Sequence, residues 1–236
     1  TKSAINKTEF KENKYLLISE NSAWDLIHKW RKVDENFAYY SFRLACDFTA
    51  HPNQVDFNTW AARQKINISD LFPSINKNEF LKLDLSVNSE WLGLSENFKD
   101  LNIFENKINY LQQQNINKII SGGYLEPRQL YNTDNYERES NNGIENRTIH
   151  LGVDFWVNEG TEITNLFDGV IDTISIDKNE KGYGGLIILK HQINDFSFYT
   201  LFGHLSHKKF NHNKGDFLKK GELIGQVGNK LENGNW

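Results

Sequence analysis

The sequence is poor in several features that define common protein classes. It has a single cysteine, Cys46, so no internal disulfide can form. No apolar run approaches the roughly 18 residues that span a bilayer, so a transmembrane segment is not expected. The net charge is -4 with acids and bases interspersed, and no basic face suited to phosphates is visible. Nucleic acid is therefore not an expected partner.

Methionine is also absent, and proline is scarce, with three residues in the whole sequence. Because the sequence lacks an initiating methionine, the absence of a signal peptide from it says little about the cellular compartment. The 236 residues include sixteen Phe, nine Tyr and six Trp, which excludes a disordered tail. The length allows one large domain or two modest ones.

The distribution of glycine divides the chain near residue 140. Thirteen of the sixteen glycines lie between Gly143 and Gly234, and all three prolines precede them. We predict an α+β protein with a mainly helical region at residues 1–137 and an all-β domain at residues 138–236.

Apolar spacings of three and four predict helices in the first region. Alternating apolar residues there also predict two short strands. The helices are expected at residues 22–33, 37–48, 55–66 and 97–114, and the strands at 80–87 and 116–120.

The second region carries short β-branched or aromatic segments bounded by Gly, Asn or Asp. Such spacing predicts an antiparallel sandwich or open barrel. The strands are expected at residues 163–166, 169–176, 185–191, 196–204 and 222–227. The polar residues 138–146, which include Asn-Asn-Gly, predict a loop.

The sharpest local feature is His150-Leu151-Gly152-Val153-Asp154. Alternation places His150 and Asp154 on one face of a strand. Four residues of straight strand span roughly 13 Å, so both side chains can reach one ion only if the strand bends, which Gly152 permits most readily. Imidazole and carboxylate together suit Zn²⁺. The alternative is a satisfied histidine beside a turn-capping aspartate.

Two further motifs follow. His204 ends an apolar strand in Gly203-His204-Leu205-Ser206, where it would act as a general base or oxyanion partner or simply face solvent. The segment from Gly215 to Gly225 is mainly structural, and lipoyl- or biotinyl-carrier domains show similar patterns. The aliphatic neighbours of a carrier's attachment lysine are missing here.

Taken in order, these motifs resemble the lysostaphin-type (LytM-type) zinc endopeptidases. The resemblance covers about residues 147–236. It rests on His-x-Gly-x-Asp at 150–154, Gly-Thr at 160–161, Asp-Gly-Val at 168–170, Tyr-x-x-x-Gly-His-Leu-Ser at 199–206 and Gly-x-x-x-x-x-Gly-x-x-Ile-Gly at 215–225. The chain departs from the family at Phe202, where members often carry tyrosine.

The resemblance implies a duplicated-hybrid-motif β fold and zinc-dependent hydrolysis of peptide bonds, with peptidoglycan peptides as the usual substrate. It implies that His150 and Asp154 bind zinc and that His204 is catalytic. The family's third ligand belongs to a later His-x-His motif, which is expected after Trp236. The 236 residues alone are then expected to bind zinc weakly and to leave peptides intact.

A weaker resemblance covers three segments of the first region, at residues 15–20, 83–87 and 123–128. They resemble the segment before this domain in fusions of a phosphotransferase, a peptidase-like domain and a class-III aminotransferase. This implies flanking enzyme domains and a cytoplasmic location; otherwise the protein would be periplasmic or extracellular.

Residues with lesser roles complete these expectations. Glu126, Arg128 and Arg147 either support the metal pair or contact substrate, but surface salt bridging is the favoured interpretation. His191 is expected to be structural. The alternative to an enzyme is an inactive binding or scaffold module of the same fold that positions flanking enzyme domains.

Overall fold

The computed structural model describes residues 53–77, 79–87, 89–93, 100–128, 131, 136–140, 143–146, 148–179 and 181–234. The chain divides into two compact units, Thr1–Gln64 and Lys65–Trp236. The helices predicted at residues 22–33 and 37–48 lie outside the described residues.

The described part of the first unit contains helix α4, Gln54–Ala61. It begins one residue before the helix predicted at residues 55–66 and ends earlier. The rings of Phe57 and Trp60, three residues apart on this helix, lie 5.8 Å apart. Their contact is the neighbouring-turn contact that the apolar spacing predicts.

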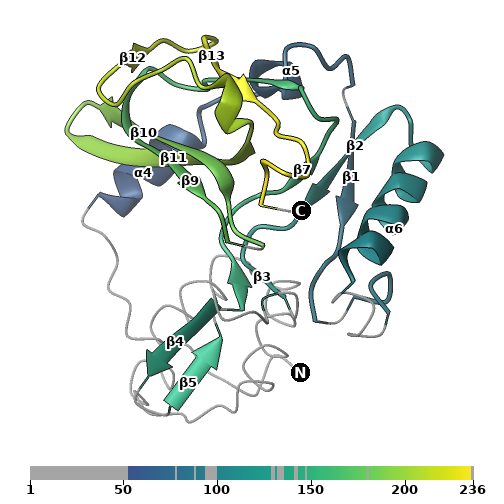
Figure 1. The fold of residues 1–236 in the computed structure, drawn as a ribbon. Helices are drawn as coiled ribbons and strands as arrows, with labels where there is room; N and C mark the ends of the chain where they lie inside the picture. The colour runs from purple at the N-terminus through teal and green to yellow at the C-terminus, as the bar shows by residue number, and fades with distance from the viewer. Residues whose placement is uncertain are drawn as a thin grey trace, which may run out of the picture. The chain divides into compact units, whose positions relative to one another are not determined.

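The second unit contains a short β-α-β arrangement (Figure 1). Strands β1 (Glu79–Leu83) and β2 (Lys118–Gly122) pair in parallel, and helix α6 (Leu101–Gln114) connects them. Asp100 caps α6 by accepting a hydrogen bond from the Asn102 N–H at 2.9 Å. A third strand, β7 (Phe155–Trp156), pairs antiparallel with β2.

Helix α6 covers this sheet with its apolar stripe. Phe104 and Ile108 are buried against Ile120 of β2, which has no exposed surface. Leu83, Leu85 and Leu92 complete this small core. The packing fixes the end of β2, and the chain enters the candidate site directly after it.

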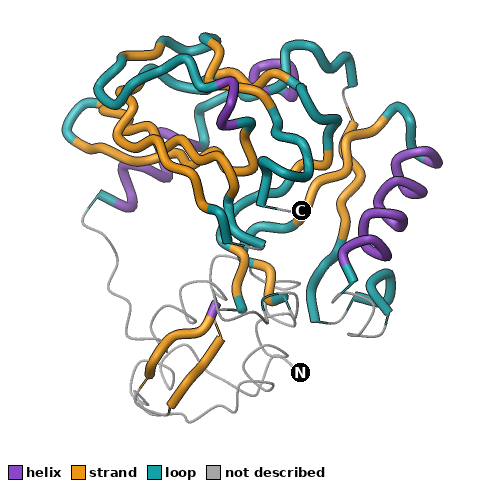
Figure 2. The backbone as a smooth tube through the Cα atoms, viewed as in Figure 1, coloured by secondary structure: helices purple, strands orange, loops and turns teal. Residues whose placement is uncertain are grey.

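The second unit also contains a four-stranded antiparallel sheet (Figure 2). Its order is β11 (Phe196–Leu205), β10 (Gly184–Ile193), β9 (Gly169–Asp177) and β12 (Phe217–Leu218). Alternate residues of the two long central strands, Ile171, Ile187 and Leu189, are fully buried. This alternation is the one that a half-buried sheet requires.

The second unit also contains three pairs of short strands. They are β13 (Leu223–Gln226) with β8 (Glu162–Thr164), β3 (Glu126–Pro127) with β6 (Ile149–His150), and β4 (Glu137–Ser140) with β5 (Gly143–Asn146). The last pair corrects the loop predicted at residues 138–146. Its two strands contain a single large apolar residue, Ile144, so the sequence shows no apolar alternation there.

The main core extends beyond the β segment. Ile68 and Phe72, at the short helix α5 (Ile68–Leu71) and just after it, are buried with Ile119 against residues such as Ile187 and Leu205. Thr164 also donates a hydrogen bond to the Asp70 carbonyl at 2.7 Å. Residues before 137 therefore share a core with residues after it.

The predicted fold class is confirmed: helical elements precede a mostly β region built on an antiparallel sheet. Each of the five strands expected after residue 160 exists within two or three residues of its predicted ends. Over the described ranges, no helix is long and apolar enough to cross a membrane.

Candidate functional site

His150 and Asp154 lie on either side of an interrupted strand. β6 ends at His150, the backbone bends at Gly152, and β7 begins at Phe155. Leu151 and Val153 are 68% and 48% exposed, so neither is a core residue. The bend brings His150 Nε2 within 3.3 Å of Asp154 Oδ1. The predicted bend is thus present, and it converges the two side chains.

The hydrogen bonds of His150 show what this pair can hold. Its Nδ1 lies 3.0 Å from the carbonyl oxygen of Gly123, which can only accept, so Nδ1 carries a proton. Nε2 then faces a carboxylate oxygen. A lone pair on Nε2 opposite Oδ1 would be repulsive unless a cation lies between them. The pair is therefore complementary to a proton or to a metal ion.

The other oxygen of Asp154 is engaged by a buried arginine. Arg128 Nη1 donates to Oδ2 at 2.6 Å, and Arg128 Nε donates to Glu126 Oε2 at 2.8 Å. Arg128 and Glu126 are only 3% and 6% exposed. The favoured interpretation of these two residues as surface salt bridges is therefore wrong. Arg147 lies outside the described residues.

These contacts set the charge of Asp154. Burial alone would raise the pKa of its carboxyl, but the His150 hydrogen bond and the Arg128 charge outweigh burial, and the pKa lies well below its ordinary value. Burial would likewise lower the pKa of Arg128, yet Asp154, Tyr131 and Glu126 raise it. Asp154 is thus held as a carboxylate.

The backbone ties the two halves of this pair together. Glu126 is the register partner of His150 in the β3–β6 pair, and the Arg128 N–H donates to the Thr148 carbonyl at 2.7 Å. The Gly122 N–H donates to the Asp154 carbonyl at 2.8 Å. The residues that orient His150 and Asp154 therefore come from the stretch just after β2.

Sequence reasoning missed the roles of Gly122, Gly123 and Tyr131. Gly122 is the informative one, because a Cβ added there would lie 2.8 Å from Arg128 Nη2 and 3.2 Å from the Trp156 ring. The adjacent glycines after an apolar strand were a signal for this close approach.

His204 lies on a bulge near the end of β11. The β10–β11 register shifts between Gly185 and Ile187, opposite residues 202–205, and His204 has φ +59°. Its backbone N–H donates to the Tyr183 carbonyl, and its Nδ1 donates to the Asn233 carbonyl, each at 2.6 Å. Bulges and positive φ at a non-glycine residue are typical of functional positions.

A series of contacts runs from the His150 region toward His204. The Tyr131 ring lies 6.4 Å from that of His150 and stacks on Tyr136 at 4.4 Å. Tyr136 donates to the Lys181 carbonyl at 2.6 Å, and Lys181 belongs to the β9–β10 turn that contacts His204 through Tyr183. Tyr131 and Tyr136 thus connect the surroundings of His150 with those of His204.

His191 behaves as the sequence predicts for a structural residue. It is fully buried, donates from Nδ1 to the Asp168 carbonyl at 3.0 Å, and contacts Thr200 Oγ1 through Nε2 at 2.7 Å. Burial lowers its pKa. This neutral histidine fills a core position and leaves no ring nitrogen for catalysis.

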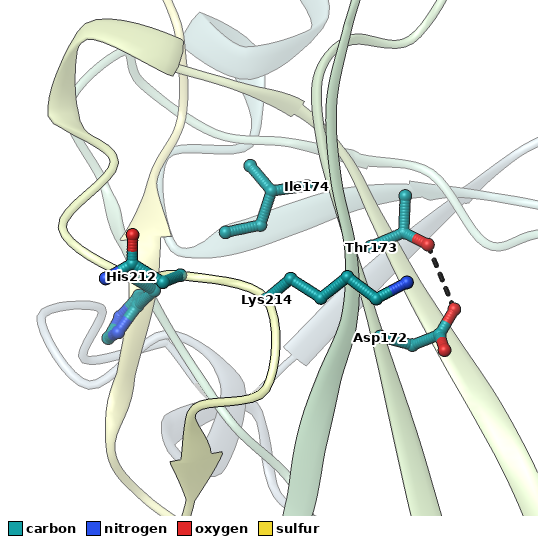
Figure 3. Close-up of a pocket in the computed structure, with 6 residues that line it drawn as sticks. Asp172, Thr173, Ile174, His212 and Lys214 are labelled. Carbon is teal, nitrogen blue, oxygen red and sulfur yellow. Dashed lines mark hydrogen bonds between the residues drawn. The ribbon is translucent and has the colours of Figure 1, made fainter.

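A surface pocket lies elsewhere on the second unit (Figure 3). It has a volume of about 510 Å³, and Thr173 donates to Asp172 at its edge at 2.9 Å. Its lining residues are Asp172, Thr173, Ile174, His212, Asn213 and Lys214. None of the predicted site residues is among them, so this hollow is separate from the candidate site.

Within the part of the chain that the structure describes, no group of three or more His, Cys, Asp or Glu side chains is arranged to hold a metal. His150 and Asp154 supply two candidate ligands. A complete catalytic site with three protein ligands would need another.

The segment in which His150 and Asp154 converge is rich in β-strands. Residues 148–235 match the model of peptidase family M23, so this segment is a domain of that family. The resemblance to lysostaphin-type endopeptidases is thereby confirmed for these residues. Comparison with curated proteins finds no match.

Proposed function

We propose that the chain carries a zinc-dependent metalloendopeptidase domain in which His150 and Asp154 bind the metal and His204 assists proton transfer. The observation that carries the proposal is the 3.3 Å separation of His150 Nε2 and Asp154 Oδ1 within a peptidase family M23 segment. We also propose that the chain is divided into a mainly helical region, residues 1–137, and the peptidase-like β domain, residues 138–236.

The separation of the two atoms agrees with tetrahedral zinc. Zinc–nitrogen and zinc–oxygen bonds are about 2.0–2.2 Å long, which places two ligands of a tetrahedron roughly 3.3 Å apart. His150 also has the ring orientation that a ligand needs, because Gly123 fixes the proton on Nδ1.

When bound, zinc would polarise the scissile carbonyl and lower the pKa of water toward about 7. Asp154 supplies negative charge, and Arg128 keeps this carboxylate ionised. His204 donates its Nδ1 proton to the Asn233 carbonyl, which leaves Nε2 to accept a proton or to contact a developing oxyanion. The backbone strain at His204 supports a functional role for its placement.

For the substrate, we propose peptides of the peptidoglycan type, which are typical for this family. The observation in favour is the family match alone. Flanking enzyme domains, which the weaker resemblance of the first region implies, would make smaller wall-derived peptides the accessible substrates.

The alternative is a binding or scaffold module of the same fold. Among the described residues, His150 and Asp154 are the two ligands that converge. A module of this fold would keep the pair as a weak or structural metal site and leave peptides intact.

Competition with a chromophoric chelator tests the metal site. We expect the chain to bind one Zn²⁺, and His150→Ala and Asp154→Ala to weaken binding at least tenfold. His212→Ala, a histidine in the separate pocket, serves as the control and should leave binding unchanged. Affinities that are equal in the wild type and both site variants would refute the metal site.

Hydrolysis separates the two candidates once the metal site is established. The full-length protein is incubated with a wall-derived peptide, and cleavage is followed by mass spectrometry. Cleavage that His204→Gln abolishes supports the enzyme. Zinc binding without cleavage supports the module.

A further inference from the structure

We propose that Arg128 is a positioning residue that makes Asp154 a one-oxygen ligand and thereby sets the metal preference of the site. The inference rests on the proposed function and extends the site to residues before the family M23 segment. Arg128 contacts Oδ2 at 2.6 Å, while Oδ1 alone faces His150 at 3.3 Å.

The guanidinium is held firmly enough to impose this division. Its Nε donates to Glu126, its Nη1 also contacts the Tyr131 hydroxyl at 3.4 Å, and the side chain is almost fully buried. Glu126 is itself anchored, because its Oε1 accepts from the Leu85 N–H at 3.0 Å. The carboxylate of Asp154 therefore cannot rotate to offer both oxygens without breaking a buried, charge-assisted bond.

Two effects of Arg128 on a bound cation oppose each other. Its positive charge repels the metal, whereas its hydrogen bond orients the ligand. Glu126 lies at hydrogen-bonding distance on the opposite side of the guanidinium and offsets the charge. The remaining effect of Arg128 is then to orient the carboxylate of Asp154. Loss of such an orienting contact typically lowers metal affinity 10–100-fold.

A one-oxygen carboxylate also discriminates between metals. Zinc favours four ligands in a compact tetrahedron. Larger ions that prefer oxygen, such as Mn²⁺, gain from a carboxylate that can offer both oxygens. With Oδ2 occupied by Arg128, the site should prefer Zn²⁺, and release of Oδ2 should reduce that preference.

Gly122 provides an independent way to disturb Arg128 without changing any charge. An added Cβ would meet Arg128 Nη2 at 2.8 Å, the Trp156 ring at 3.2 Å and Asp154 Cβ at 3.4 Å, so the guanidinium, which is the nearest of the three, would have to leave its present position. Gly225 is the matched control, because an added Cβ there meets only Leu205 Cδ1 at 3.8 Å.

The test compares the wild type with Glu126→Gln/Arg128→Gln, a double variant that removes one charge of each sign. Zn²⁺ affinity is measured by chelator competition, and Mn²⁺ affinity by electron paramagnetic resonance. We expect at least a tenfold loss of Zn²⁺ affinity and a tenfold fall in the Zn²⁺-to-Mn²⁺ ratio. Gly122→Ala should change both in the same direction, and Gly225→Ala should change neither.

Asp154→Ala distinguishes failure of the metal site from failure of the positioning role of Arg128. If it abolishes binding while the double variant and Gly122→Ala stay within twofold of the wild type, Arg128 has no positioning role and the metal site stands. If Asp154→Ala binds zinc like the wild type, the metal site fails and the inference fails with it. Should the double variant not fold, Gly122→Ala decides alone.

Discussion

The two regions that carry the candidate site are stabilised by different means. The His150–Asp154 pair is held by buried charged side chains, Glu126 and Arg128, from outside the family M23 segment. His204 is held by backbone carbonyls, a register shift and a positive φ, all within that segment. The His150–Asp154 pair therefore depends on side chains from outside the segment, whereas His204 depends on backbone contacts within it.

The difference shows how a site can extend beyond the segment that a family defines. Residues 148–235 contain both candidate ligands and the candidate catalytic histidine, but the contacts that orient the ligands come from residues 122–131. The His150–Asp154 pair should therefore respond to changes outside the segment, and His204 to changes of backbone conformation.

Removal of the residues before Thr148 should have the largest effect on stability. A chain of residues 148–236 loses the buried side chains of Ile68, Phe72 and Ile119 from the main core. Each comparable core truncation costs about 2–5 kcal/mol, so together they reach the whole stability of a domain, about 5–15 kcal/mol.

We therefore expect residues 65–236 to unfold cooperatively on heating and residues 148–236 to show no cooperative transition. Circular dichroism measures both. A sharp transition in the shorter chain would show that the segment folds without its neighbours.

The next largest effect concerns the buried charges. Arg128→Ala leaves Glu126 and Asp154 as carboxylates without their partner and should lower the free energy of unfolding by about 3–5 kcal/mol. Glu126→Gln/Arg128→Gln should cost less, because it removes a charge of each sign. Urea denaturation of both variants checks the order, and an equal or larger cost for the double variant contradicts it.

Substitutions of His204 should have a smaller effect on the free energy of unfolding, but glycine and alanine should be in an unusual order there. In an ordinary strand, glycine is less stable than alanine by roughly 0.5–1 kcal/mol. At φ +59° the order should reverse, with His204→Gly more stable than His204→Ala by about 1 kcal/mol. The same pair of substitutions at Tyr199, an exposed residue of the same strand, should keep the usual order in urea denaturation.

His191 should give the smallest effect, and it provides a reference for a histidine that is held by the core. Its pKa is lowered in the folded state, so the unfolded chain binds the proton more readily. The contribution of His191 to stability is then fully present above the unfolded pKa of about 6.5 and is lost as the pH drops below it. His191→Gln should reduce this slope between pH 7 and 5, as measured by urea titrations; an unchanged slope would assign it to other groups.

Strand positions after residue 160 could be predicted from the sequence because apolar alternation and flanking glycines are local signals. The approach of His150 and Asp154 could be predicted as well, because alternation places both on one strand face and Gly152 permits the bend between them. The hairpin at residues 137–146 could not, since its strands carry no apolar face. The parallel pairing of β1 with β2 was not predicted either, because it joins residues about forty positions apart.

The positioning role of Arg128 was missed for a related reason. Charged residues are almost never fully buried unless paired, so a surface location was the sound expectation. Its burial depends on Asp154, 26 positions away. Nothing in the local sequence around Arg128 records that partner.

The shared core has a consequence for how the chain reaches its folded state. Ile68 contacts the same core as Ile224, and β3 pairs with β6 across more than twenty residues. Such contacts close large loops, whose entropy must be lost before the contacts can compensate for it. Proteins rich in distant contacts fold slowly. The His150–Asp154 pair, which needs β2, β3, β6 and β7 together, should therefore form only when most of the second unit has already assembled.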